Sequence, residues 1–100
     1  QIEELEPFGE GNPEPLFYTR NLKLKSEPEV LSRDTLRFWV TDDGGLTYKA
    51  VGFNMGIMKD EILTSDYFDL VYTPSLDRWH EPAGIQLEIK DIRLFKKGLL

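Results

Sequence analysis

Hydrophobic and polar residues alternate in two stretches of the chain, which is the pattern of a β-strand with one buried face. Within residues 16–25, Leu22 and Leu24 alternate with Lys23 and Lys25. In the second stretch, residues 36–41, one face carries the apolar residues Leu36, Phe38 and Val40. The other face carries Arg37, Trp39 and Thr41. These stretches predict the first two strands of a sheet.

A hairpin and a third strand are predicted next. The Glu-Pro-Glu run at 27–29 interrupts the chain between the first two strands, and Asp-Asp-Gly-Gly at 42–45 favours a tight turn into a third strand over 46–53. Apolar residues in that strand occupy both phases, namely Leu46 and Tyr48, and Val51 and Phe53. A bulge or burial of both faces would account for the two phases.

A short helix and two further strands complete the predicted order. Asn54 is expected to cap a helix over residues 55–63, with Met58 and Ile62 on one face. A fourth strand over 67–73 is expected to stop at Pro74, and a fifth over 85–94 to bury Ile85, Leu87 and Ile89.

The order of three strands, a helix and two strands predicts an all-β fold with one short helix, a five-stranded OB-fold barrel over residues 16–94. An unrelated α+β meander is the alternative. Three prolines and two glycines within residues 7–15 exclude a regular helix or central strand there. Residues 1–15 are therefore expected to form a linker, and residues 95–100 a tail.

The composition is that of one folded domain. The chain has 100 residues, 40% hydrophobic and 12% aromatic, which suffices for one core. The formal net charge is −6, but five glutamates and no Lys or Arg lie in residues 1–14, so 13 acidic and 12 basic residues remain beyond them. The body is nearly neutral, and the position of each cation matters more than the total. No cysteine is present, and no apolar run approaches the roughly 20 residues that cross a bilayer, so we expect a cytoplasmic domain without membrane contact.

The sequence lacks the residue clusters that catalysis requires. Its one histidine, His80, has no acidic neighbours at metal-ligand spacing, so neither a metal site nor a catalytic residue is expected. The Gly-Glu-Gly segment at 9–11 lacks the Gly-Lys-Ser/Thr that completes a phosphate loop. A small enzyme is therefore the remotest functional alternative.

Basic and aromatic residues on the predicted outward faces are the candidates for ligand contacts. They are Lys23, Lys25, Arg37, Trp39 and Lys49, with Arg78 and Trp79 in the loop before the last strand. Single-stranded nucleic acid is held by cations that follow the phosphates and by rings that stack on the bases. Structural alternatives exist for each: surface lysines also protect sheet edges, Trp39 can be covered by a loop or a neighbouring domain, and Trp79 can fold over the barrel end.

Residues 5–17, Leu-Glu-Pro-Phe-Gly-Glu-Gly-Asn-Pro-Glu-Pro-Leu-Phe, have an unusual and specific composition. They closely resemble the segment that joins the catalytic core of the bacterial RecJ exonucleases to their OB domain. Residues 22–40 resemble the first two strands of that domain, residues 50–54 the end of its third strand, and residues 86–92 its closing strand. The resemblance extends over nearly all of residues 5–94.

RecJ enzymes degrade single-stranded DNA from the 5′ end in DNA repair and recombination, with manganese or magnesium held by a DHH core whose motifs this chain lacks. The resemblance therefore implies a domain that has no catalytic centre or cofactor of its own, binds single-stranded DNA, and feeds it to the DHH core of the parent chain. A structural or protein-interaction module, in which Trp39 packs against that core, is the alternative.

Overall fold

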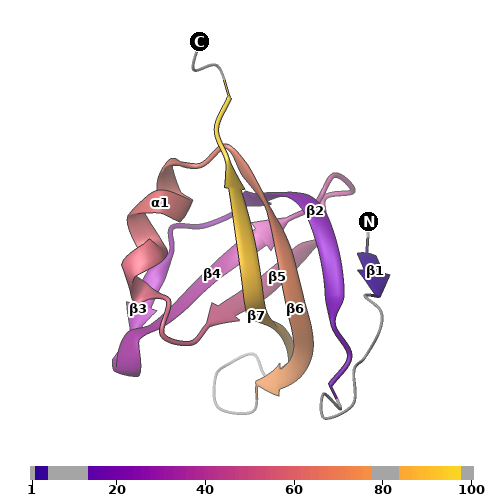
Figure 1. Cartoon of the computed structure of the whole chain (residues 1–100), viewed down its shortest axis with the longest axis horizontal. Helices are drawn as coiled ribbons and strands as arrows, with labels where there is room; N and C mark the ends of the chain where they lie inside the picture. The colour runs from indigo at the N-terminus through magenta and orange to yellow at the C-terminus, as the bar shows by residue number, and fades with distance from the viewer. Residues whose placement is uncertain (1, 5–13, 78–83, 98–100) are drawn as a thin grey trace.

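Five strands form a closed barrel in the computed structural model, which describes residues 2–4, 14–77 and 84–97. Around the ring they are β2 (Phe17–Leu24), β6 (Tyr67–Asp77), β7 (Gly84–Phe95), β5 (Thr47–Gly52) and β4 (Thr35–Thr41). Pairing of β2 with β4 closes the ring, and β5 and β7 run parallel while the other neighbours are antiparallel. Figure 1 shows the long β6–β7 hairpin crossing in front of β4 and β5. The predicted OB-type barrel is confirmed.

Alternation in β4 determines which side chains form the core. Leu36, Phe38 and Val40 are buried completely or nearly so, whereas the residues between them keep partial exposure. The Phe38 ring meets the Phe68 ring of β6 edge to face, with centroids 5.8 Å apart and planes at 82°. The predicted inward face of this strand is confirmed, and its other face is directed away from the core.

The β4–β5 hairpin forms where the Asp-Gly run predicted it. The amide of Gly45 donates to the Asp42 carbonyl over 3.1 Å, and Gly45 has a φ of +82°, which favours glycine. The Asp42 carboxylate accepts hydrogen bonds from the Leu46 amide and the Tyr48 hydroxyl. Desolvation acts to raise the pKa of Asp42, but these hydrogen bonds outweigh it and lower that pKa.

Strand β5 is buried on both faces over residues 49–52, which was one of the two explanations for the mixed phases, but Leu46 and Phe53 lie outside the strand and are exposed. Its six pairs with β4 run without a register shift, so no bulge is needed. Inward-facing Ala50 is fully buried, and Val51, on the opposite face, is 5% exposed. At Lys49 and Val51 the outer face of β5 is therefore shielded by neighbouring parts of the protein.

Two short strands extend the sheet beyond the five predicted ones. Strand β1 (Ile2–Glu4) pairs with β2, within the predicted linker. Strand β3 (Glu29–Leu31) pairs with β4, and a 3-10 turn at Ser32–Asp34 joins the two strands. In the sequence, residues 27–29 were interpreted only as an interruption, because a strand of three residues is too short for an alternation pattern to be recognised.

A 3-10 turn (η2, Gly56–Met58) and the helix α1 (Lys59–Thr64) lie between β5 and β6, as predicted. Ile62 is the buried residue of the helix, and Met58 packs beside it against the core. The predicted cap at Asn54 is wrong: the residue before η2 is Met55, and no side chain caps it. Asn54 instead has a φ of +59° and serves the turn out of β5.

The β6–β7 hairpin is longer than predicted and extends beyond β2. Strand β6 continues through Pro74, where it pairs with Leu87 of β7, whereas its pairing with β2 ends at Tyr72. Proline has no amide proton to donate, and this is tolerated at Pro74 because β6 does not pair with β2 beyond Tyr72. The predicted burial of Ile85 is also wrong, because Ile85 pairs with Leu76 in this extension, where both side chains are exposed.

Candidate nucleic-acid interface

The outer face of β4 and β5 carries the most prominent of the predicted contact residues. In the antiparallel register Trp39 pairs with Lys49 and Arg37 with Val51, so these four side chains lie on one face of the sheet. Phe38 lies between Arg37 and Trp39 and occupies the core. The structure thus brings Arg37 and Trp39 together on one side of the barrel, each partly exposed.

Arg37 is engaged with an acidic neighbour on this face. Its Nη2 and Nε donate to the same oxygen, Oε1 of Glu29, over 3.0 and 3.3 Å. The cross-strand register places Glu29 of β3 directly opposite Arg37 of β4. The Arg37 side chain is 22% exposed and that of Glu29 59%, so water reaches the ion pair.

Two open clefts adjoin this ion pair. The first, here called the Val51 groove, has a volume of about 410 Å³ and is lined by Leu31, Ser32, Thr35, Arg37, Val51, Phe53, Asp77 and Gln86. The second, here called the Trp39 cleft, has a volume of about 620 Å³ and is lined by Ser26, Glu27, Pro28, Glu29, Val30, Trp39 and Lys59. The first combines three apolar side chains with one guanidinium and one carboxylate, and the second combines a tryptophan with two glutamates and one lysine.

Lys23 and Lys25 lie at the end of β2 that pairs with β4. Lys23 is opposite Thr41, and the Lys25 amide donates to the Trp39 carbonyl over 2.8 Å. Both lysines are exposed. Their backbones therefore place two cations beside the strand that carries Trp39.

Lys49 differs from the prediction that it lies exposed on an outward face. It does lie on the Trp39 face, but it is only 6% exposed, and its ammonium donates to the carboxylate of Asp77, which is 4% exposed. Asp77 is the last residue of β6, so the β6–β7 hairpin covers this part of β5. The predicted exposure of Lys49 is wrong because alternation identifies a face but not what covers it.

Arg78 and Trp79, the two predicted loop contacts, lie outside the described residues, as does His80. Asp77, which precedes them, lines the Val51 groove. The contacts of Arg78 and Trp79 remain predictions.

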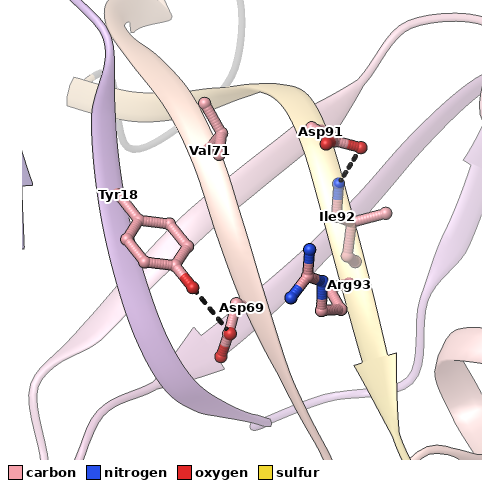
Figure 2. Close-up of a pocket in the computed structure, with 6 residues that line it drawn as sticks. All are labelled: Tyr18, Asp69, Val71, Asp91, Ile92 and Arg93. Carbon is pink, nitrogen blue, oxygen red and sulfur yellow. Dashed lines mark hydrogen bonds between the residues drawn. The ribbon is translucent and has the colours of Figure 1, made fainter. Parts of the chain in front are cut away.

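A smaller cleft lies on another face of the barrel, over β2, β6 and β7. Its volume is about 200 Å³, and Figure 2 shows Tyr18 and Arg93 on either side of β6, with the Arg93 guanidinium directed toward that strand. The Tyr18 hydroxyl donates to Asp69 over 2.9 Å, and the Arg20 guanidinium lies 5.2 Å from the centre of the Tyr18 ring. Two arginines and one ring are thus grouped on a face that the predictions did not include.

Strand β2 is irregular beside this second face, because buried Thr19 and Leu22 are three residues apart rather than two. This spacing reflects a bulge in β2, where Asn21 has a φ of +60°. The Asn21 amide donates to the buried carboxylate of Asp69 over 3.0 Å. Asp69 therefore holds the bulge in place.

Replacing Asp69 with Ala is expected to lower the free energy of unfolding by about 1–3 kcal/mol, because the Asn21 amide and the Tyr18 hydroxyl lose their acceptor. Urea denaturation measures this loss. Tyr18→Phe, which removes one of the two hydrogen bonds, should cost less. An Asp69→Ala protein as stable as the wild type would show that the carboxylate does not hold the bulge.

No group of three or more His, Cys, Asp or Glu side chains is close enough to hold a metal ion in the described part of the chain. Within the same part, no helix has the length and apolar character needed to cross a membrane.

The closed ring, the parallel β5–β7 pair and the helix between β5 and β6 define a small OB domain with clefts on the outer face of β4 and β5. The sequence family described as the RecJ OB domain matches residues 1–91, and the chain belongs to this family. The match confirms the resemblance and indicates a nucleic-acid-binding domain of a RecJ-like protein. A comparison with curated protein sequences gave no match.

Proposed function

We propose that the chain is the single-stranded-DNA-binding OB domain of a RecJ-like 5′→3′ exonuclease and that it positions DNA for a catalytic DHH core in the same parent protein. The observation that carries the proposal is a partly exposed Trp39 next to Arg37 on the outer face of β4, each of them lining a cleft, in a chain of the RecJ OB family. Any manganese or magnesium would belong to the parent's catalytic core.

The proposed contacts divide into stacking and charge. The Trp39 ring offers a flat surface to a base of any sequence, since every base has a π-face. Lys23, Lys25 and Arg37 lie on or beside the same strand and would neutralise phosphates along the backbone. Lys49 is left out because its ammonium is buried against Asp77. Arg78 and Trp79 are kept as proposed contacts of the adjoining loop.

The charge distribution favours weak binding by the domain alone. Glu27 and Glu29 both line the Trp39 cleft, and the body of the chain is nearly neutral. Few counterions are released when few phosphates are neutralised, so affinity should be low and should fall as salt rises. Such a domain contributes to DNA binding mainly when it is linked to a second site in the same protein.

A protein-interaction module is the second candidate function. It is favoured by exposed apolar residues near the helix, where Ile57 is 86% exposed and Leu63 44% exposed. In this alternative, Trp39 is covered by a neighbouring domain of the parent protein and makes no contact with DNA.

Replacing Trp39 with Ala is expected to weaken binding of single-stranded oligonucleotide by about 1–3 kcal/mol, because one stacking contact is lost. The chain has two tryptophans, so a Trp79→Phe background makes Trp39 the sole indole reporter. Titration with oligo(dT) of roughly 12 nucleotides, within the usual site size of OB domains, should quench its fluorescence at low salt.

The control for this experiment is Ile57→Ala, which removes an exposed apolar side chain from another part of the surface. Anisotropy of a labelled oligonucleotide measures both variants on one scale. If Trp39→Ala and Ile57→Ala bind as the wild type does, and no quenching occurs at millimolar oligonucleotide, the DNA-binding face is wrong and the interaction module is favoured.

A further inference from the structure

The Arg37–Glu29 ion pair joins two residues that line different clefts of the outer face. Arg37 lines the Val51 groove, and Glu29, directly opposite it in the register, lines the Trp39 cleft. A ligand that occupies both clefts would therefore contact this pair.

Glu29 engages the edge of the guanidinium that an anion would use. Nε and Nη2 both donate to one carboxylate oxygen, over 3.3 and 3.0 Å. A phosphate oxygen makes the same charge-assisted hydrogen bonds to an arginine, often through the same pair of donors. The carboxylate thus occupies a phosphate position on Arg37.

The carboxylate is placed so that it can be displaced. Glu29 begins a strand of three residues, which is the last in the sheet order and has no strand on its other side among the described residues. Its side chain is 59% exposed. An exposed ion pair of this kind is only marginally stable in water, so a phosphate can compete for the guanidinium.

We propose that Glu29 competes with nucleic-acid phosphate for Arg37. This competition lowers the affinity of the outer face for single-stranded DNA, and Glu29 releases Arg37 only when DNA occupies the two clefts. The inference rests on the proposed function, because it assigns a regulatory residue to the same face. Bound DNA would exchange one anion for another at Arg37, with no change in the barrel.

Replacing Glu29 with Gln tests the proposal, since the variant keeps the size and polarity of the side chain and removes its charge. We expect oligo(dT) to bind about two- to fivefold more tightly, the equivalent of an exposed ion pair. Glu27→Gln is the matched control. Glu27 lines the same Trp39 cleft, but its carboxylate is 3.9 Å from Lys59 and is not bonded to Arg37.

A double-mutant cycle with Arg37→Met makes the test specific for the pair. The gain from Glu29→Gln should exceed that from Glu27→Gln and should disappear in the Arg37→Met background. An equal gain in both glutamine variants, or a gain that persists without Arg37, would overturn the proposal, because either result reflects general repulsion.

A titration with inorganic pyrophosphate separates this inference from the proposed function. The NMR signal of the Arg37 Nε–H reports whether pyrophosphate binds to the guanidinium. If neither the wild type nor Glu29→Gln binds oligonucleotide, but pyrophosphate shifts the Arg37 signal more readily in Glu29→Gln, the competitor is supported and DNA binding is not. If pyrophosphate shifts the signal equally in both proteins or in neither, Glu29 does not compete for this position.

Discussion

Lys49→Met is expected to lower the free energy of unfolding by about 3–5 kcal/mol, although it changes one lysine of a surface strand. The Lys49 ammonium and the Asp77 carboxylate are both almost fully buried and bonded to each other. The substitution removes the cation that balances the charge of the buried carboxylate. Urea denaturation, followed by the intrinsic tryptophan fluorescence, measures the loss.

The double variant Lys49→Met/Asp77→Leu distinguishes loss of charge balance from loss of packing. Replacing a buried ion pair by apolar residues of similar size is often neutral or stabilising, so the double variant should recover much of what Lys49→Met loses. Lys59→Met is the control for an exposed lysine, because its contact with Glu27 is 3.9 Å long and open to water. Equal stability of Lys49→Met and Lys59→Met would contradict the buried pair.

The Lys49–Asp77 pair also has a consequence for the candidate interface. Asp77 and Gln86 come from the two strands of the extended hairpin, and both line the Val51 groove. Along this extension β6 has no β2 partner, while β7 still pairs with β5 over Lys49–Val51. The ion pair therefore adds a side-chain link that holds one wall of the groove against β5.

The barrel was predictable from the sequence because its main strands carry strong local patterns. Alternation at Leu36, Phe38 and Val40 gives the inward face of β4, and the Asp-Gly run gives the hairpin that follows. The extension of β6 through Pro74 was not predictable, because it depends on where β2 ends in space. The exposure of Ile85 follows from the same extension, which continues beyond the core.

The candidate interface was predictable only in part. Trp39 and Arg37 were found because they oppose an apolar face on one strand. The pairing of Arg37 with Glu29 requires the strand β3, and the pairing of Lys49 with Asp77 joins residues 28 positions apart in the chain. Contacts of this kind depend on tertiary register, for which a single sequence has no periodic signal.

Phe38→Ala is expected to lower the free energy of unfolding by about 3–5 kcal/mol, because it removes a ring from the centre of a closely packed core. Phe38 is 1% exposed and meets Phe68 of the opposite side of the barrel edge to face. Phe38→Leu keeps most of the apolar volume and should lose less. Thermal and urea unfolding of the two variants measure this order.

Trp39 is the matched comparison for Phe38, because the two aromatic residues are adjacent in β4 but lie on opposite faces of the strand. Trp39→Ala should cost less stability than Phe38→Ala despite removing a larger side chain, because the indole is already partly in water. Oligonucleotide affinity should show the reverse order, with Phe38→Leu close to the wild type and Trp39→Ala weakened. If Trp39→Ala unfolds the protein as readily as Phe38→Ala does, the indole is part of the packed structure, and the outer face of β4 cannot offer it to a base.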